Sequence, residues 1–456
     1  MAICHVSVTG RDRRHLTALG PKLRIVVVGY REDERGAVVD AYIPAEKVGW
    51  LERHGYRVTV LEEVDLHDRR RQAEGRRGAE TRLRRGRYGD VIWGGGYLTA
   101  EEVEGALEIG AANHAGYCER IALPNLTWER RRCHALRIGK GRDRGRTGIG
   151  LVGGIHGREW GSPDILVYFG MRLLRAYRDR QGIRLGKKSF TAAQIRRIVE
   201  EKDVILFPQV NPDGRRFSME RHPMWRKNRR PPPPGRGSRC VGVDLNRNFP
   251  FLWRFDRHFA PLTVESSHNA GDYETYVGPR PASEPETRNV IWLLDRCPQL
   301  RYLVDLHSYG ETILYSWGSD DNQSRNPRMS FKNPAYDGRR GRIHDDVYRE
   351  FIPAADEAQA LRIGRHMAAA IRHVRGREYR VRQSVGLYPT AGACDDYTYS
   401  RHRVDRKQSK IIAYTMEWGR SHATTPFHPP YEEMRKVMRE VAAGLLELCL
   451  RAEPPG

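Results

Sequence analysis

The chain has 456 residues, with 79 lysines and arginines against 57 aspartates and glutamates, and a formal net charge of +22. This length is enough for one large domain or for two to three ordinary ones, each with a buried core. The arginines are spread along the whole chain, which is typical of a solvated surface and argues against nucleic-acid binding as the main role. No stretch reaches the roughly 18 apolar residues of a membrane-spanning helix, so no membrane partner is expected.

The seven cysteines are widely spaced and include no Cys-x-x-Cys pair. This pattern argues against a disulfide framework and against a structural zinc ribbon. The first 14 residues lack a basic segment followed by an apolar core, so no signal peptide is predicted. On these features alone the sequence indicates a cytoplasmic protein.

The N-terminal part predicts a small α+β domain within residues 1–68. Strands are expected at 23–30, 37–43 and 56–61, with a helix at 45–54. Residues 66–88 contain nine arginines and predict a solvated linker or an exposed, protease-sensitive hinge. We therefore expect a linker at 69–95 and a main domain at 96–451.

In the main domain, predicted strands alternate with predicted helices. Thr99 and Glu102 have the spacing of a capping box at a helix start. Strands are expected at 121–123, 133–138, 148–153, 204–209, 301–307 and 410–417, and further helices at 163–178, 191–200, 284–294, 358–374 and 430–450. The alternation predicts the α/β class, with a mixed sheet between helices. The polar stretch 318–348 has no periodicity and is expected to be a functional or a disordered loop.

A metal site is indicated where two predicted strands end. His156 and Glu159 follow an apolar run and two glycines, and His307 ends another apolar run. Zinc accepts imidazole nitrogen and carboxylate oxygen, and a catalytic zinc typically has three protein ligands. A His-x-x-Glu pair also occurs by chance, so companion motifs have to decide between a zinc site and coincidence.

Five further blocks supply those companions. They are Asn-Pro-Asp-Gly at 211–214, Met-Trp-Arg-Lys-Asn-Arg at 224–229, Cys-Val-Gly-Val-Asp-Leu-Asn-Arg-Asn-Phe at 240–249, Gly-Leu-Tyr-Pro at 386–389 and Thr-Met-Glu-Trp at 415–418. In this order, over about residues 97–450, they resemble the zinc metallocarboxypeptidase family of the pancreatic carboxypeptidases A and B. The resemblance implies a mixed eight-stranded sheet flanked by helices, one zinc ion per chain, and hydrolysis of the C-terminal bond of peptides or proteins. It also implies a secreted monomer.

The resemblance assigns roles to individual residues. His156, Glu159 and His307 match the zinc ligands, and Asp244 matches the carboxylate that orients the first histidine. The general base and the group that stabilises the oxyanion are expected to be Glu417 and Arg229.

Substrate-binding residues are implied in the same way. Asn246, Arg247 and Tyr388 match the groups that hold the free C-terminal carboxylate, and Arg158 matches a subsite further along the peptide. Asp395 falls where the B type carries an aspartate, which predicts a preference for C-terminal Lys or Arg. Alternatively, Asp395 caps a loop or pairs with a neighbouring arginine, and the net charge of +22 opposes the approach of basic peptides.

Some features depart from the family pattern. The position expected to pair with Cys240 in a disulfide is Asp272, and extra residues lie around 231–234 and 318–348. Residues 20–65 resemble the family's propeptide domain, which would place an activation cleavage within 69–87.

Two alternatives remain open on the sequence. A deacylase of N-acyl amino acids shares the zinc frame, but the retained carboxylate-binding residues favour peptides. An inactive relative that binds peptides or nucleic acid is the second alternative, and the presence of Glu417 and all three ligands argues against it. The same ligands would also fit cobalt or nickel.

Overall fold

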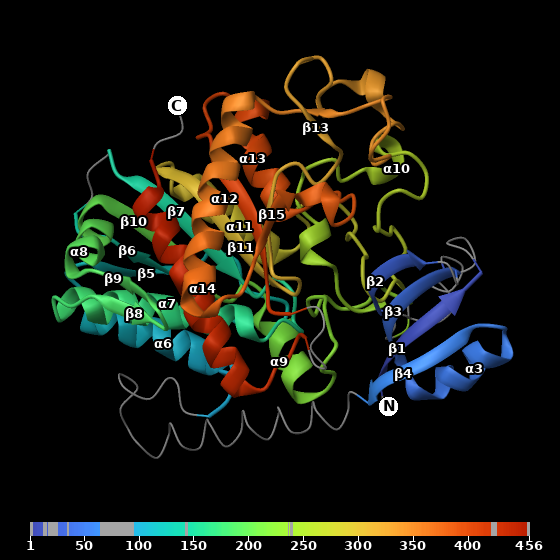
Figure 1. The fold of residues 1–456 in the computed structure, drawn as a ribbon, viewed down its shortest axis with the longest axis horizontal. Helices are drawn as coiled ribbons and strands as arrows, with labels where there is room; N and C mark the ends of the chain where they lie inside the picture. The colour runs from blue at the N-terminus through green and yellow to red at the C-terminus, as the bar shows by residue number, and fades with distance from the viewer. Residues whose placement is uncertain are drawn as a thin grey trace.

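The computed structural model describes residues 3–11, 16, 26–33, 36–63, 95–141, 145–235, 237, 240–420 and 426–453. These residues form a small N-terminal sheet domain beside a larger α/β domain (Figure 1). Residues 64–94, which include all of the predicted linker 69–95 except Gly95, lie outside the described residues. None of the described helices combines the length and apolar character needed to span a bilayer.

The N-terminal domain is an antiparallel four-stranded sheet in the order β2-β3-β1-β4. Its elements are β1 (Ile3–Gly10), β2 (Val26–Asp33), β3 (Gly36–Pro44), η1 (Ala45–Lys47), α3 (Val48–Arg53) and β4 (Arg57–Glu63). The helix and three strands were expected, but β1 was not. Cys4, Val6 and Val8 alternate along β1 and are buried in the small core, which is the two-residue period of a strand with one covered face.

The large domain contains an eight-stranded mixed sheet, as predicted, in the order β15-β12-β16-β11-β7-β10-β6-β5. Its strands are β5 (Cys118–Ala122), β6 (His134–Ile138), β7 (Thr147–Gly153), β10 (Lys202–Phe207), β11 (Leu300–Ser308), β12 (Thr312–Tyr315), β15 (Arg380–Gln383) and β16 (Ile412–Trp418). The central strands β10, β7, β11 and β16 are mutually parallel. Both β7 and β10 are buried along their whole length, because a parallel sheet is covered on both faces.

The large domain also contains helices, most of which pack on the sheet or on one another. They are α6 (Ala100–Asn113), α7 (Gly161–Arg178), α8 (Ala192–Glu201), α9 (Pro212–Glu220), α10 (Phe255–His258), α11 (Pro285–Arg296), α12 (Ala354–Arg375), α13 (Cys394–Val404) and α14 (Tyr431–Arg451). Helices α12 and α14 pack against each other and lie in front of the sheet in Figure 1, and α14 also packs on α7. The predicted capping box at the start of α6 is present, with Thr99 and Glu102 each accepting the other's backbone N–H.

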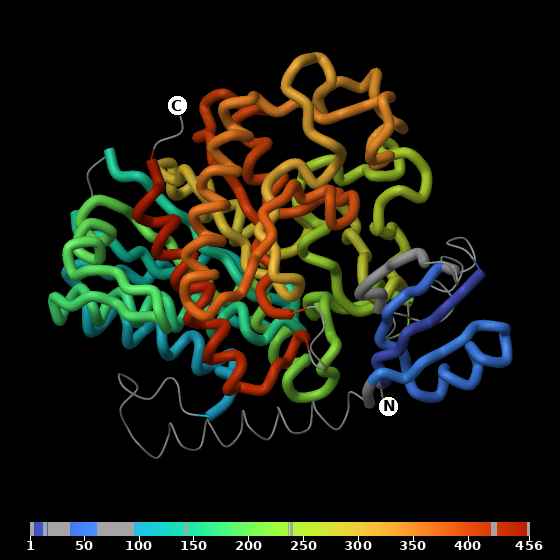
Figure 2. Tube along the Cα trace, in the orientation of Figure 1, coloured from blue at the N-terminus to red at the C-terminus, as the bar shows by residue number. Residues whose placement is uncertain are grey.

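Shorter elements complete the large domain. They are the strand pairs β8 (Ile183–Leu185) with β9 (Lys188–Phe190) and β13 (Asn322–Gln323) with β14 (Glu350–Phe351), and the turns η3 (Leu245–Arg247), η4 (Pro334–Tyr336) and η5 (Ser384–Gly386). The long segment that holds β13, η4 and β14 forms loops beside α10 at one edge of the domain (Figure 2).

That segment is packed and is not a disordered loop. Arg340 is fully buried within it and donates to the backbone carbonyls of Ser330, Asn333 and Tyr336. Asp337 forms an ion pair with Arg340 at 3.0 Å. The two terminal nitrogens of this buried guanidinium are satisfied by these acceptors, and they stabilise a segment that has little regular structure of its own.

Candidate metal centre and active site

The loop that joins β7 to α7 carries two of the predicted ligands. Gly154 has φ +66°, a conformation that favours glycine. A Cβ atom at Gly157 would lie 2.6 Å from the backbone of Gly214. The two glycines allow the chain to turn tightly against α9, and the turn presents His156 and Glu159 on the same side.

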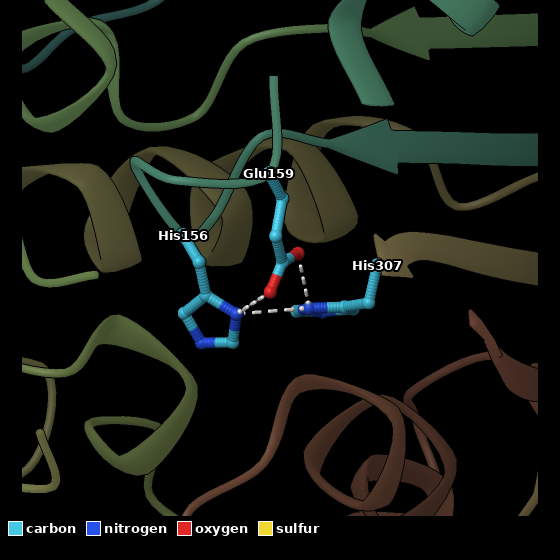
Figure 3. A group of neighbouring side chains, drawn as sticks. All are labelled: His156, Glu159 and His307. Carbon is cyan, nitrogen blue, oxygen red and sulfur yellow. Dashed lines mark hydrogen bonds and ion pairs between the residues drawn. The ribbon is translucent and has the colours of Figure 1, made fainter. Parts of the chain in front are cut away.

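His307 reaches the same point from β11. Because β7 and β11 are parallel neighbours, their carboxyl ends meet at one edge of the sheet. His156 Nδ1 lies 2.7 Å from Glu159 Oε1 and 3.1 Å from His307 Nδ1, and His307 Nδ1 lies 3.0 Å from Glu159 Oε2 (Figure 3). All three side chains are at most 4% exposed.

This donor set fits a zinc ion. Two imidazole nitrogens and a carboxylate oxygen converge so that the three ligand atoms lie within 4.8 Å of one another. Among the described residues no other group of three or more His, Cys, Asp or Glu side chains is so arranged. Nitrogen and oxygen ligands in this number are typical of a catalytic zinc site that keeps one position for water or substrate.

The charges in the cluster are strongly coupled. Burial opposes ionisation of Glu159, but the neighbouring His156 and His307 hold its pKa below the usual range. Burial likewise opposes protonation of His307, yet the carboxylates of Asp305 and Glu159 raise its pKa well above the ordinary value. The carboxylates of Glu159 and Asp305 therefore favour a positive charge at this point.

Asp244 contacts the His156 ring at Nε2, the nitrogen that does not face Glu159 and His307. Its Oδ1 lies 3.2 Å from His156 Nε2 and accepts the backbone N–H of Asn246 at 3.0 Å. Arg226 donates two hydrogen bonds to Oδ2, at 2.8 and 3.0 Å. Burial alone would raise the pKa of Asp244, but Arg226 and His156 hold it well below the usual range. The carboxylate is thus anionic and fixes the His156 ring.

Glu417 lies at the end of β16, beside the cluster. Burial, together with the charge of Glu159, raises the pKa of Glu417 to about 8, against a lowering effect from His307. Its Oε2 atom has no hydrogen-bond partner in the described part of the chain. A carboxylate with an available oxygen next to the metal ligands is suited to accept a proton.

The structure does not bring Arg229 into this cluster. The Arg229 guanidinium stacks over Phe217 at 3.7 Å, and its Nε lies 3.6 Å from Glu129. Arg226 is the arginine that reaches the centre, through Asp244. It belongs to the same Trp-Arg-Lys-Asn-Arg block, and the sequence alone contains no periodic signal that tells the two arginines apart.

The structure places Asn246 and Arg247 in one turn, with Tyr388 near the Arg247 guanidinium. Asn246 and Arg247 form the η3 turn directly after Asp244, and both are buried. The Arg247 guanidinium lies 5.8 Å from the centre of the Tyr388 ring and donates to the backbone carbonyls of Asn246 and Glu265. These contacts hold the guanidinium in place for a planar anion such as a carboxylate.

Asp395 lies in the first turn of α13 and is buried. Its oxygens accept hydrogen bonds from Ser384 Oγ and from the backbone N–H of Asp396, both at 2.9 Å. Burial raises the pKa of Asp395, and the hydrogen bond from Ser384 opposes this effect. No Lys, Arg or His among the described residues forms an ion pair with it, so the alternative of a neighbouring arginine has no support there.

Arg158 lies next to Glu159 in the loop after β7 and is buried. It forms an ion pair with Glu274 at 2.8 Å, and its guanidinium lies 4.7 Å from the centre of the Phe427 ring. Tyr42, from β3 of the N-terminal sheet, packs on Phe427 with the ring centroids 6.2 Å apart. The apolar cluster around these rings also contains Met224, Tyr273 and Tyr309. The small domain therefore contacts the large one beside Arg158.

Cys240 forms no disulfide, which is the departure from the family pattern that the sequence indicated. All seven cysteines are free thiols. The carboxylate of Asp272, at the position expected to pair with Cys240, instead accepts the backbone N–H groups of Glu274 and Thr275.

Comparison with known proteins agrees with this geometry. The sequence profile of the zinc carboxypeptidase family matches residues 115–444, which is most of the chain. The chain belongs to the zinc carboxypeptidase family. Carboxypeptidase A1 of Sus scrofa is 26% identical over 375 residues, covering 80% of this chain and 74% of that protein.

Carboxypeptidase A4 of Mus musculus is 26% identical over 315 residues, covering 69% of this chain. The matched part spans 61% of that relative's own length. Two crystal structures share the fold. Carboxypeptidase A from Helicoverpa armigera aligns with a TM-score of 0.72 at 19% identity, covering 99% of this chain and 98% of that one. Thrombin activatable fibrinolysis inhibitor aligns with a TM-score of 0.70 at 20% identity, covering 98% of each chain.

Proposed function

We propose that this chain is a zinc-dependent metallocarboxypeptidase that releases single residues from the C-termini of peptides or proteins. The observation that carries the proposal is that His156, Glu159, His307 and Glu417 meet at one sheet edge beside buried Asn246 and Arg247. A zinc ion held by the first three residues would supply Lewis acidity toward water and the scissile carbonyl.

Glu417 and Arg226 then carry out two different parts of the reaction. Glu417 accepts a proton from the attacking water and passes it to the leaving amine. Arg226 takes the part that the sequence pattern assigned to Arg229, because Arg226 is buried at the centre whereas Arg229 stacks outside it. A fixed guanidinium there stabilises the negative charge that develops on the carbonyl oxygen.

Arg247, Asn246 and Tyr388 bind the free carboxylate of the substrate. An internal peptide bond offers no anion to pair with the buried Arg247, so the site selects chain ends. An N-acyl amino acid carries the same carboxylate, and a deacylase therefore remains the second candidate. The subsite beside Arg158 and Phe427 favours peptides, since a small acylated amino acid would not reach it.

We also propose a preference for basic C-terminal residues. The support is the buried carboxylate of Asp395, which has no cationic partner among the described residues. Burying an anion is costly unless a cation approaches it, and the side chain of a substrate Lys or Arg would provide that cation.

The N-terminal domain is proposed to act as a propeptide-like cover. Tyr42 lies against Phe427, over the side of the site where residues preceding the scissile bond would lie. Its ring would compete with a bound peptide for that apolar surface. Cleavage within residues 69–87 would release the domain and expose the subsite.

The experiment uses two peptides that differ only in a C-terminal Arg or Phe. Release of the terminal residue is measured with and without a chelator, on the intact chain and on a chain cleaved within 69–87. Chelator-sensitive release of Arg over Phe supports the zinc mechanism and the selectivity, whereas release of Phe over Arg retains only the mechanism. Hydrolysis of an N-acyl amino acid but of neither peptide would favour the deacylase, and no release from any form overturns the proposal.

A further inference from the structure

The carboxylate of Asp305 contacts the third proposed metal ligand, His307, and the sequence motifs did not identify this residue. Asp305 precedes His307 by two residues on β11, so both side chains point to the same face of the sheet. Both are buried, at 0% and 2% exposure. Asp305 Oδ2 lies 2.9 Å from His307 Nε2, the ring nitrogen that faces away from Glu159 and His156.

Asp305 has no cationic partner other than His307 in the described structure. Besides His307, the Cys394 thiol, a weak donor, interacts with its carboxylate, and no Lys or Arg forms an ion pair with it. Its register neighbours on the adjacent strands are Thr415 on β16 and Val152 on β7. A buried carboxylate is expensive unless a cation or donor compensates it, and His307 is the group that does so here.

The contrast with Asp244 makes the role of Asp305 specific. Asp244 is held by Arg226 and by a backbone N–H, so its position does not depend on His156. Asp305 lacks such anchors, and apart from the weakly donating Cys394 thiol its carboxylate interacts with the ligand His307. We therefore expect the buried carboxylate of Asp305 to orient His307 and not to stabilise the surrounding sheet.

We propose that Asp305 is a positioning residue of the zinc centre, which fixes His307 with the proton on Nε2 and the lone pair of Nδ1 toward the metal. Both histidine ligands are then held by a carboxylate on the side away from the metal, His156 by Asp244 and His307 by Asp305. Such partners orient the ring and make the metal-binding nitrogen more basic. The inference rests on the proposed zinc centre and not on the peptide specificity.

The test is the zinc affinity of the full chain, measured by competition with a chromogenic chelator. Asp305→Asn keeps the size of the side chain but removes its charge, and we expect it to weaken zinc binding by about 10–100-fold. The matched control is Asp356→Asn, which removes a buried carboxylate that bonds to Tyr399 and Lys410 at 2.7 and 2.9 Å. The control should bind zinc like the unmodified chain.

A second measurement keeps the proposal falsifiable if Asp305→Asn does not fold. In the zinc-loaded unmodified chain with labelled histidines, NMR should show slowly exchanging, downfield Nε2–H protons from both His156 and His307. Equal zinc affinities of Asp305→Asn and the unmodified chain, or absence of the His307 proton, would overturn the role of Asp305 alone. Failure of the unmodified chain to bind zinc would overturn the proposed function as well.

Discussion

His307 and Glu417 are register partners on the parallel strands β11 and β16, so a metal ligand and the proposed general base lie side by side at one sheet edge. In parallel strands such partners point to the same face, and here His307 is buried while Glu417 is partly buried. Because Glu417 is not among the three converging ligands, its role can be separated from metal binding.

The first prediction follows from this pair. Glu417→Gln removes the proton acceptor but keeps the shape, so kcat should fall by roughly 10²–10⁴ while zinc content is unchanged. Steady-state release of the terminal residue and metal analysis of the same sample check this. Glu108→Gln, at an exposed position on α6, serves as the control. A variant with normal kcat would exclude Glu417 as the base.

The second prediction compares two arginines of one block. Arg226→Ala should lower kcat by roughly 10²–10³, because it removes both the proposed oxyanion donor and the partner of Asp244. Arg229→Ala should leave kcat within a few-fold and lower the free energy of unfolding by about 0.5–1 kcal/mol, through loss of stacking on Phe217. The opposite order of effects would restore Arg229 to the catalytic role.

The third prediction concerns the pocket carboxylate. In Asp395→Asn, kcat/KM for a C-terminal Arg should fall about 10–100-fold, while that for Phe is unchanged or increases, because a charged hydrogen bond is lost. Asp396→Asn is the matched control, since Asp396 instead accepts the backbone N–H of Gly318 at 3.0 Å. An unchanged ratio of the two substrates in Asp395→Asn would discard Asp395 as the selector.

The fourth prediction concerns pH and the loops between β13 and β14. Burial raises the pKa of Glu350 from 4.5 to about 7, although Tyr348 Oη and the Phe331 N–H donate to it at 2.6 and 2.8 Å. Between pH 4.5 and about 7, the folded state therefore keeps a proton on Glu350 that the unfolded state has already released. The associated stability is present below pH 4.5 and is lost as the pH rises through about 7.

The loss amounts to at most about 3 kcal/mol, since one pKa unit corresponds to about 1.4 kcal/mol. Urea unfolding at pH 5 and pH 8 measures it. Glu350→Gln, which cannot ionise, should show a smaller difference between the two midpoints than the unmodified chain. Equal pH dependence in both proteins would show that Glu350 remains ionised when folded.

The fifth prediction tests the cover formed by the N-terminal domain. Tyr42→Ala should raise the peptidase activity of the intact chain about 3–10-fold, because an aromatic contact contributes about 0.5–1.5 kcal/mol to docking. Trp50→Ala is the control, since that ring stacks on His54 within the small domain. If Tyr42→Ala and the cleaved chain are no more active than the intact chain, the domain is not inhibitory.

Local patterns in the sequence sufficed for the regular parts of the fold. The runs that became β7, β11 and β16 are mostly apolar and buried, and amphipathic periodicity located most of the long helices. The strands β12 and β15 were missed because each has only four residues, too few to show a period. The helix α13 was missed because polar residues dominate its sequence.

The sequence by itself determined the α/β class, and it predicted the ligand set His156, Glu159 and His307 because these residues and the blocks around them match the motifs of the zinc carboxypeptidase family. Only the tertiary structure decided that Arg226 reaches the centre and Arg229 stacks outside it, that Asp305 contacts His307, and that Tyr42 lies on Phe427. The reason is physical: side-chain directions in irregular loops, and contacts between elements far apart in the chain, follow from packing and not from local periodicity.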